Sequence, residues 1–143
     1  MIESPAPGRY VLAYLLWLVT LALSLLCAML TRTVYQFLAV SVGWSPATIR
    51  VLDNFALVII ALVLVTVIVM AEHSYRTGVH ANRLFLRFST FTLGEVVVLA
   101  LLQLTLVILQ LMLGNVDIIN IGIFIIVALL AWLLTRWRKS LKA

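Results

Sequence analysis

The sequence predicts an all-α integral membrane protein, a four-helix bundle of up-down-up-down topology with both termini in the cytoplasm. Three observations lead to this prediction. The chain has four long stretches without a charged residue, 65% of its 143 residues are hydrophobic with a mean hydropathy of +1.22, and it lacks the residue alternation of barrel strands. A soluble domain of this size could not bury so much apolar surface. Because lipid offers the backbone no hydrogen-bond partners, the spans must be helices.

Each charge-free stretch is long enough to cross the bilayer, since about 20 helical residues span a hydrocarbon core roughly 30 Å thick. The stretches are residues 10–31, 54–71, 96–116 and 118–135. They predict spans near 10–31, 53–72, 94–113 and 117–136 within one transmembrane domain that comprises residues 1–143. The first stretch is longer than the apolar region of a signal peptide, and no small-residue cleavage site follows it, so we expect a retained helix.

The basic residues are distributed unevenly between the two sides of the membrane. With four spans, the N-terminus, the middle connection and the C-terminus share one side. That side carries eight basic residues, namely Arg9, Arg76, Arg83, Arg87, Arg136, Arg138, Lys139 and Lys142. The other side carries Arg32 and Arg50. The positive-inside rule therefore predicts cytoplasmic termini in the plasma (inner) membrane, with the basic tail against anionic headgroups and no need for nucleic acid.

Local signals predict where the first two helices meet. Residues 33–44 are too few for a span, so they either extend the first helix or lie in the membrane interface. Gly43 is a plausible helix terminator. Ser45 and Pro46 have the pattern of an N-cap followed by a proline in the first helical turn, which places the start of the second helix there.

The other helix ends follow from similar signals. The second helix should end near Gly78, and Asn82 is a candidate cap for a third helix over residues 83–113. Gly114 and Asn115 should break the chain before the fourth helix. Connections this short make neighbouring helices antiparallel.

Two charge clusters flank the second and third spans. Counting about 20 residues back from Gly114 places Glu95 at the inner edge of the hydrocarbon, which argues against a proton-coupled transporter. We interpret both clusters as neutralising helix ends and fixing register. The alternative for the inner arginines is an anion or lipid-headgroup site, because guanidinium groups suit phosphate. The inner cluster comprises Glu72, Arg76, Arg83, Arg87 and Glu95, and the outer cluster comprises Arg32, Arg50 and Asp53.

Two helices carry polar or small-residue stripes. On the third helix the stripe consists of Ser89, Thr92, Glu95, Gln103 and Gln110, and on the first of Ala13, Trp17, Thr20, Ser24, Cys27 and Thr31. The second stripe has the 3.5-residue repeat of left-handed helix packing. Because amides facing lipid are costly, the stripes should bond within one bundle, pack against another subunit or line a substrate path. The predicted helix-partner interface comprises Thr20, Ser24, Cys27, Thr31, Gln103 and Gln110.

Few residues suggest chemistry. The chain has no catalytic serine elbow, phosphate-binding glycine loop or HExxH motif, and its single Cys27 cannot form an internal disulfide or a metal site. We therefore predict neither enzymatic activity nor a cofactor. His73 and His80 leave open a haem or pigment site, although solvated histidines at the interface are the simpler interpretation.

The region from Asp53 to about residue 102, with the segment HSYRTGVHANRLFLRF, resembles the phosphate-starvation-inducible membrane protein E (PsiE-like) family. The residues that match are Tyr75, Gly78, His80 and Arg83. The resemblance implies a small four-span inner-membrane protein with a stress-linked role. The family has a basic residue near the position of Glu95, so this chain departs from the pattern there.

Three functional hypotheses follow. The first is a non-catalytic membrane protein that acts through helix–helix binding, either PsiE-like or an accessory subunit of a larger complex. The second is a small homo-oligomeric transporter or channel lined by Glu95, Gln103 and Gln110. The third is a haem- or pigment-binding subunit that uses His73 or His80.

Overall fold

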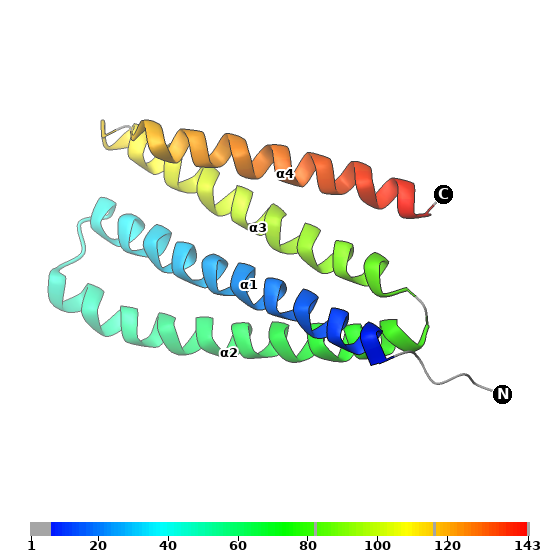
Figure 1. The fold of residues 1–143 in the computed structure, drawn as a ribbon. Coiled ribbons are helices and arrows are strands. Elements are labelled where there is room, and N and C mark those ends of the chain that lie inside the picture. Colours follow the sequence, from blue (N-terminus) through cyan, green and yellow to red (C-terminus); the bar gives the residue numbers. More distant parts are fainter. Residues whose placement is uncertain (1–6, 82, 116, 143) are drawn as a thin grey trace.

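The computed structural model describes residues 7–81, 83–115 and 117–142, and within them it contains four helices and no strand (Figure 1). The helices are α1 (Pro7–Ser41), α2 (Pro46–His80), α3 (Leu84–Met112) and α4 (Ile118–Lys142). All four are long and apolar enough to cross a membrane. The predicted all-α fold is confirmed, and the four long apolar helices agree with the predicted membrane protein.

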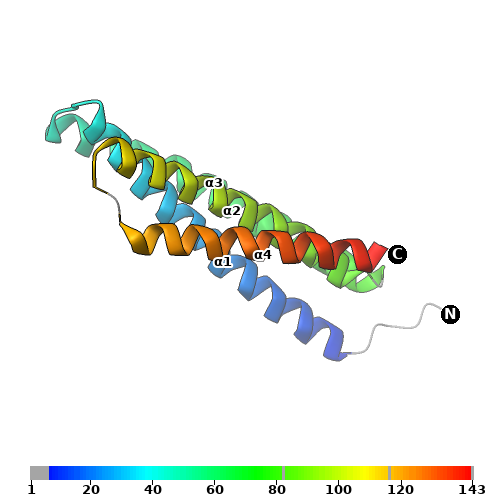
Figure 2. The same ribbon diagram turned by 90° about the horizontal axis from the view of Figure 1, so that it is seen from above.

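Consecutive helices run in opposite directions, as Figures 1 and 2 show. The start of α1, the connection from α2 to α3 and the end of α4 lie at one end of the molecule, which we call the basic end. The opposite end is called the far end. At a rise of 1.5 Å per residue, the 35-residue α1 and α2 are each about 52 Å long and exceed the hydrocarbon thickness.

The predicted helix signals at the far end act as expected. Residues 33–41 continue α1, which decides between the two alternatives for this segment. Gly43 adopts a φ of 78°, a left-handed conformation that favours glycine. Ser45 then caps α2 by accepting a hydrogen bond from the Thr48 amide, with Pro46 in the first turn. Gly114 has a φ of 71° between α3 and α4.

The helix ends near the α2–α3 connection differ slightly from the prediction. α2 continues to His80, two residues beyond the predicted end at Gly78. The predicted cap at Asn82 lies outside the described residues, and α3 begins at Leu84.

The helices form a three-helix core with the fourth helix added to one side. α1 packs against α2 and α3, and α3 also packs against α4. Within the described chain, α4 contacts α3 alone and has no fully buried residue. A square bundle would also bring α4 against α1, so this bundle is more open than a square one.

Two buried apolar clusters hold the core together. The cluster toward the basic end comprises Ala13, Ala71, Tyr75, Val79 and Leu84. The cluster toward the far end comprises Val34, Leu106 and Leu109. Polar side chains of α1 and α3 lie between these clusters, and they form the candidate site.

Candidate functional site

Glu95 of α3 is a buried acidic residue in the middle of the helix bundle. It is 8% exposed. The Ser24 hydroxyl of α1 donates a hydrogen bond to Oε1 of Glu95, and the Cys27 thiol donates to the Glu95 main-chain carbonyl at 3.6 Å. The other carboxyl oxygen, Oε2, is buried and has no hydrogen-bond partner among the described residues. One half of this carboxyl group is therefore satisfied and the other half is not.

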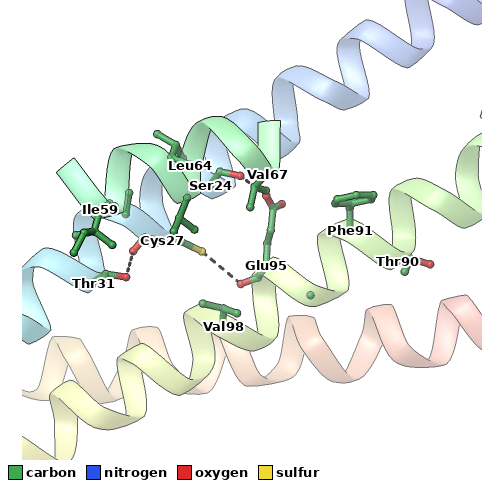
Figure 3. Close-up of a pocket in the computed structure, with 14 residues that line it drawn as sticks. Ser24, Cys27, Thr31, Ile59, Leu64, Val67, Thr90, Phe91, Glu95 and Val98 are labelled. Atoms are coloured by element: carbon green, nitrogen blue, oxygen red, sulfur yellow. Dashed lines mark hydrogen bonds between the residues drawn. The ribbon is translucent and has the colours of Figure 1, made fainter. Parts of the chain in front are cut away.

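A cleft of about 670 Å³ lies beside this carboxyl group, between α1, α2 and α3 (Figure 3). α2 contributes an aliphatic wall, α1 contributes small and hydroxyl side chains, and α3 contributes the carboxyl group and an aromatic ring. The described lining residues are Ser24, Cys27, Ala28, Thr31, Ile59, Ile60, Val63, Leu64, Val67, Thr90, Phe91, Gly94, Glu95 and Val98. Glu95 is the one charged residue among them.

The cleft opens sideways, at the apolar outer surface of the bundle. Ile59 and Val63 on the α2 side are 62% and 58% exposed, and Val98 on the α3 side is 47% exposed. These three residues lie at the rim, so the opening between α2 and α3 is bounded by exposed apolar side chains.

The sequence explains why α2 and α3 separate here. Near their connection they approach closely at Gly78, where an added Cβ would lie 3.3 Å from the Leu84 Cα. Farther along, Gly94 has no side chain, and a Cβ there would meet nothing within 4 Å. Ser24 and Ala28 of α1 are also small. The close approach at one end and the small residues beyond it leave the cleft unfilled.

The other hydroxyl groups of the cleft are already engaged. Thr31 donates to the Cys27 carbonyl at 2.7 Å, and Thr90 donates to the Leu86 carbonyl at 2.8 Å. Among the described lining residues, Oε2 of Glu95 is thus the buried side-chain oxygen without a partner.

The position of Glu95 along the bundle corrects the sequence prediction. Its partner Ser24 lies about 22 Å of helix from Arg9 and about 12 Å from Arg32, the two charges that bound the apolar stretch of α1. The carboxyl group is therefore close to the middle of that stretch and not at the inner edge. The count failed because it took Gly114 as the outer boundary of α3. Val34, just beyond Arg32 on α1, packs with Leu106, so the level of Arg32 meets α3 about two helical turns before Gly114.

The structure also separates Glu95 from the predicted inner cluster. Arg87 lies eight residues before it on α3, a rise of about 12 Å. Arg87 donates to the Ser74 carbonyl at 2.9 Å and to the Thr77 hydroxyl, so it caps the end of α2. Inclusion of Glu95 in the cluster was wrong, because α3 carries it away from the basic end.

The remaining members of the inner cluster do not converge on one point. Arg76 forms an ion pair with Glu72 at 2.8 Å and donates to the Tyr14 hydroxyl at 3.0 Å. Arg83 precedes α3 and makes no side-chain capping bond. The geometry gives these charges separate contacts at helix ends.

In the outer cluster, Arg32 and Asp53 form a two-pronged ion pair between α1 and α2. Nη2 of Arg32 lies 2.7 Å from Oδ2 of Asp53, and Nε lies 3.2 Å from Oδ1. Arg50, the third predicted member, is not part of this pair.

The predicted helix-partner residues bond within the chain. Thr20 and the Tyr75 hydroxyl lie 2.6 Å apart in the core. Gln103 donates to the Asn120 carbonyl at 3.1 Å, and the Asn120 amide donates to Oε1 of Gln110 at 3.2 Å. Ser24 and Cys27 contact Glu95, as described above. This is the geometry of the first alternative, bonding within one bundle.

The two histidines lie near the basic end. His80 is 3.2 Å from the Tyr10 hydroxyl, and both His73 and His80 are exposed. α2 remains helical through both, so they are two turns apart on one face. The described residues contain no group of three or more His, Cys, Asp or Glu side chains that could hold a metal.

Sequence reasoning missed Phe91, Gly94 and Asn120. Phe91 and Glu95 are four residues apart on α3, and this spacing could have placed them on one face. The cleft itself had no sequence signal, because it depends on the packing angle of α2 and α3.

The comparisons identify no relative: no protein-family model, curated protein or solved structure matches this chain. The resemblance to the PsiE-like family stays a prediction.

Proposed function

We propose that this chain is a non-catalytic membrane protein that binds a membrane-soluble amphiphile in the cleft between α2 and α3. The observation that carries the proposal is the unpartnered Oε2 of Glu95 at the wall of an apolar cleft of about 670 Å³. An amphiphile would place its polar head at this oxygen and its hydrocarbon against α2.

Energetics support a ligand at this place. A buried polar atom without a partner destabilises a fold by about 1–3 kcal/mol. Oε2 of Glu95 is such an atom, and it belongs to a residue that lines an open cleft. Ligand sites are mostly apolar, occupy about 300–1,000 Å³ and contain a few polar groups that fix orientation. Ionisable residues inside membrane spans are costly and usually serve function. The Glu95 cleft has each of these properties.

This proposal differs from the helix-partner hypothesis in what is bound. Most of the stripe residues that motivated a partner subunit contact other residues of the same chain. A channel receives little support, because Gln103 and Gln110 contact Asn120 and do not line the cleft. Binding in the cleft retains the central idea of a protein that works without catalysis.

We also propose that the basic end faces the cytoplasm. α1 begins, α2 and α3 connect, and α4 ends there (Figure 1). Eight of the ten basic residues are on the segments that meet at this end. The positive-inside rule would orient such a protein in the plasma (inner) membrane with these segments inside.

The test uses a hexadecanol that carries a photoactivatable diazirine in its chain, added to the protein in lipid nanodiscs. Saturable labelling of peptides from residues 59–67 and 90–98 is expected. Gly94→Leu should abolish it, because the new side chain extends into the cleft. Gly122→Leu is the matched control, since a Cβ there also meets nothing within 4 Å but residue 122 is on α4.

Two results would overturn the proposal. One is labelling that never saturates and is equal in the two glycine variants, which would indicate ordinary lipid contact. The other is a second copy or another protein occupying the cleft, detected by native mass measurement after extraction in mild detergent.

A further inference from the structure

The acidic residues of the described chain differ in what stabilises their negative charge. Some have a basic partner in the chain, and others are exposed to solvent. Asp53 pairs with Arg32, and Glu72 pairs with Arg76. Asp117 is exposed and accepts a bond from the Ile119 amide at 3.0 Å. Glu95 is buried, and its side-chain hydrogen bond comes from the neutral hydroxyl of Ser24. It is the described acid that lacks both a basic partner and solvent.

A charge at this position therefore needs a partner from outside the chain. A buried carboxylate is stable only when it is paired, and the other lining residues of the cleft carry no charge. Glu95 lines the cleft, so a partner that enters the cleft arrives beside this carboxyl group.

We propose that the cleft selects lipophilic amines, with the ammonium group of the ligand bonded to Glu95 and its hydrocarbon chain against α2. This inference rests on the proposed function and specifies its ligand class. A neutral amine that enters from lipid takes the proton of the Glu95 carboxyl group. The product is an ammonium–carboxylate pair, so no net charge enters the bilayer and no counter-ion is required.

Phe91 supplies a second element of amine recognition. It precedes Glu95 by four residues on α3, which places both on the face of the helix that lines the cleft (Figure 3). Its ring makes an edge contact with Tyr75, with the centroids 5.9 Å apart, and this contact fixes the ring. An aromatic ring beside a carboxylate favours an organic cation, through its negative face, over a neutral alcohol of the same length.

The walls provide for the rest of the ligand. Ile59, Val63 and Val67 follow one face of α2 along the cleft. They offer hydrocarbon contacts and no hydrogen bond, so a single head group with a long apolar chain fits better than a molecule with several polar groups.

The experiment compares three diazirine probes of equal chain length in nanodiscs: hexadecylamine, hexadecanol and hexadecanoic acid. In the wild-type protein, labelling of residues 90–98 should half-saturate at about tenfold less amine than alcohol, since one retained ion pair corresponds to roughly a factor of ten. The acid should not label this segment, because its carboxylate would enter an apolar cleft whose described lining offers no basic partner.

Substitutions of Glu95 and Phe91 test their contributions to amine selectivity. In Glu95→Gln the amine should fall to the level of the alcohol, while the alcohol keeps its hydrogen-bond acceptor and labels as before. Phe91→Leu should weaken the amine by about two- to fivefold more than the alcohol. Glu72→Gln is the matched control, because it removes a carboxylate outside the cleft and should leave the amine-to-alcohol ratio unchanged.

The outcomes separate the two proposals. If the amine and the alcohol label the wild type equally, or the acid labels best, amine selectivity is wrong while ligand binding stands. If none of the probes labels the cleft saturably, both proposals fail. Should Glu95→Gln lose all labelling through misfolding, the ratio in the wild-type protein decides by itself.

Discussion

Ser24 on α1 and Glu95 on α3 are joined by a hydrogen bond from the serine hydroxyl to Oε1 of the carboxyl group. The contact joins residues that are 71 positions apart in sequence and fixes the relative height of their two helices. The other carboxyl oxygen, Oε2, stays without a hydrogen-bond partner among the described residues. One hydrogen bond thus determines both the register of the core and the free side of the carboxyl group.

Replacement of Ser24 by alanine tests that contact. Ser24→Ala leaves both carboxyl oxygens without a partner, so stability should fall by about 1–2 kcal/mol. The melting temperature, followed by tryptophan fluorescence in detergent, should decrease by several degrees. Thr90→Ala is the control, because that hydroxyl lines the same cleft but bonds within its own helix, to the Leu86 carbonyl. Equal melting temperatures for the two variants would contradict the prediction.

Two tyrosines differ in whether their hydroxyl groups have a partner. The Tyr75 hydroxyl is 2.6 Å from Thr20, whereas the Tyr35 hydroxyl is buried and has no hydrogen-bond partner within the described part of the chain. Tyr75→Phe should therefore cost about 0.5–1.5 kcal/mol, and Tyr35→Phe should be neutral or stabilising. Thermal unfolding of the two variants under identical conditions measures the difference. Destabilisation by Tyr35→Phe alone would reverse the expected order and refute the interpretation.

Gly78 permits the close approach of α2 and α3 at the basic end. In Gly78→Ala the new Cβ would lie 3.1 Å from the Arg87 Cδ and 3.3 Å from the Leu84 Cα. Because Leu84 contributes backbone that cannot turn aside, we expect destabilisation of about 1–3 kcal/mol. Gly122→Ala on α4 meets no neighbour within 4 Å and should be neutral or gain a few tenths of a kcal/mol. Similar unfolding curves for both variants would show that the approach at residue 78 is looser than described.

Asn120 holds α4 against α3. Its carbonyl accepts from Gln103, and its side-chain amide donates to Gln110. Asn120→Leu keeps the main-chain acceptor of Gln103 but removes the side-chain bonds to Gln103 and Gln110, so it should cost about 1–2 kcal/mol. The cost should be strongly non-additive with Gln110→Leu in a double-mutant cycle. Asn115→Leu, at an exposed residue of the connection, is the control. Additive effects in the cycle would rule out a coupled network.

The helices and several of their ends could be predicted from sequence, because they depend on local properties. Charge-free length predicted the four long apolar helices. Gly43 and Gly114 marked reversals where the backbone adopts a left-handed conformation, and Ser45 supplied a cap that the structure contains. Each of these signals acts within a few residues of its position.

The site could be predicted only in part, because it depends on the relative heights of distant helices. Helical periodicity identified the polar faces of α1 and α3, including Ser24 and Glu95. It could not show that these two residues contact each other, or that Gln103 contacts Asn120. A depth count that used α3 alone therefore placed Glu95 too near the inner edge.

The cleft opens sideways, with Ile59 and Val63 exposed at its rim. This opening determines which ligand concentration, in lipid or in water, would control occupancy of the site. A molecule that reaches Glu95 by this route searches for it in two dimensions, within a reservoir of lipid. Occupancy is then set by the number of such molecules per lipid and not by their concentration in water. The same protein would fill its site in a small membrane and stand empty in a large one, at an identical total dose.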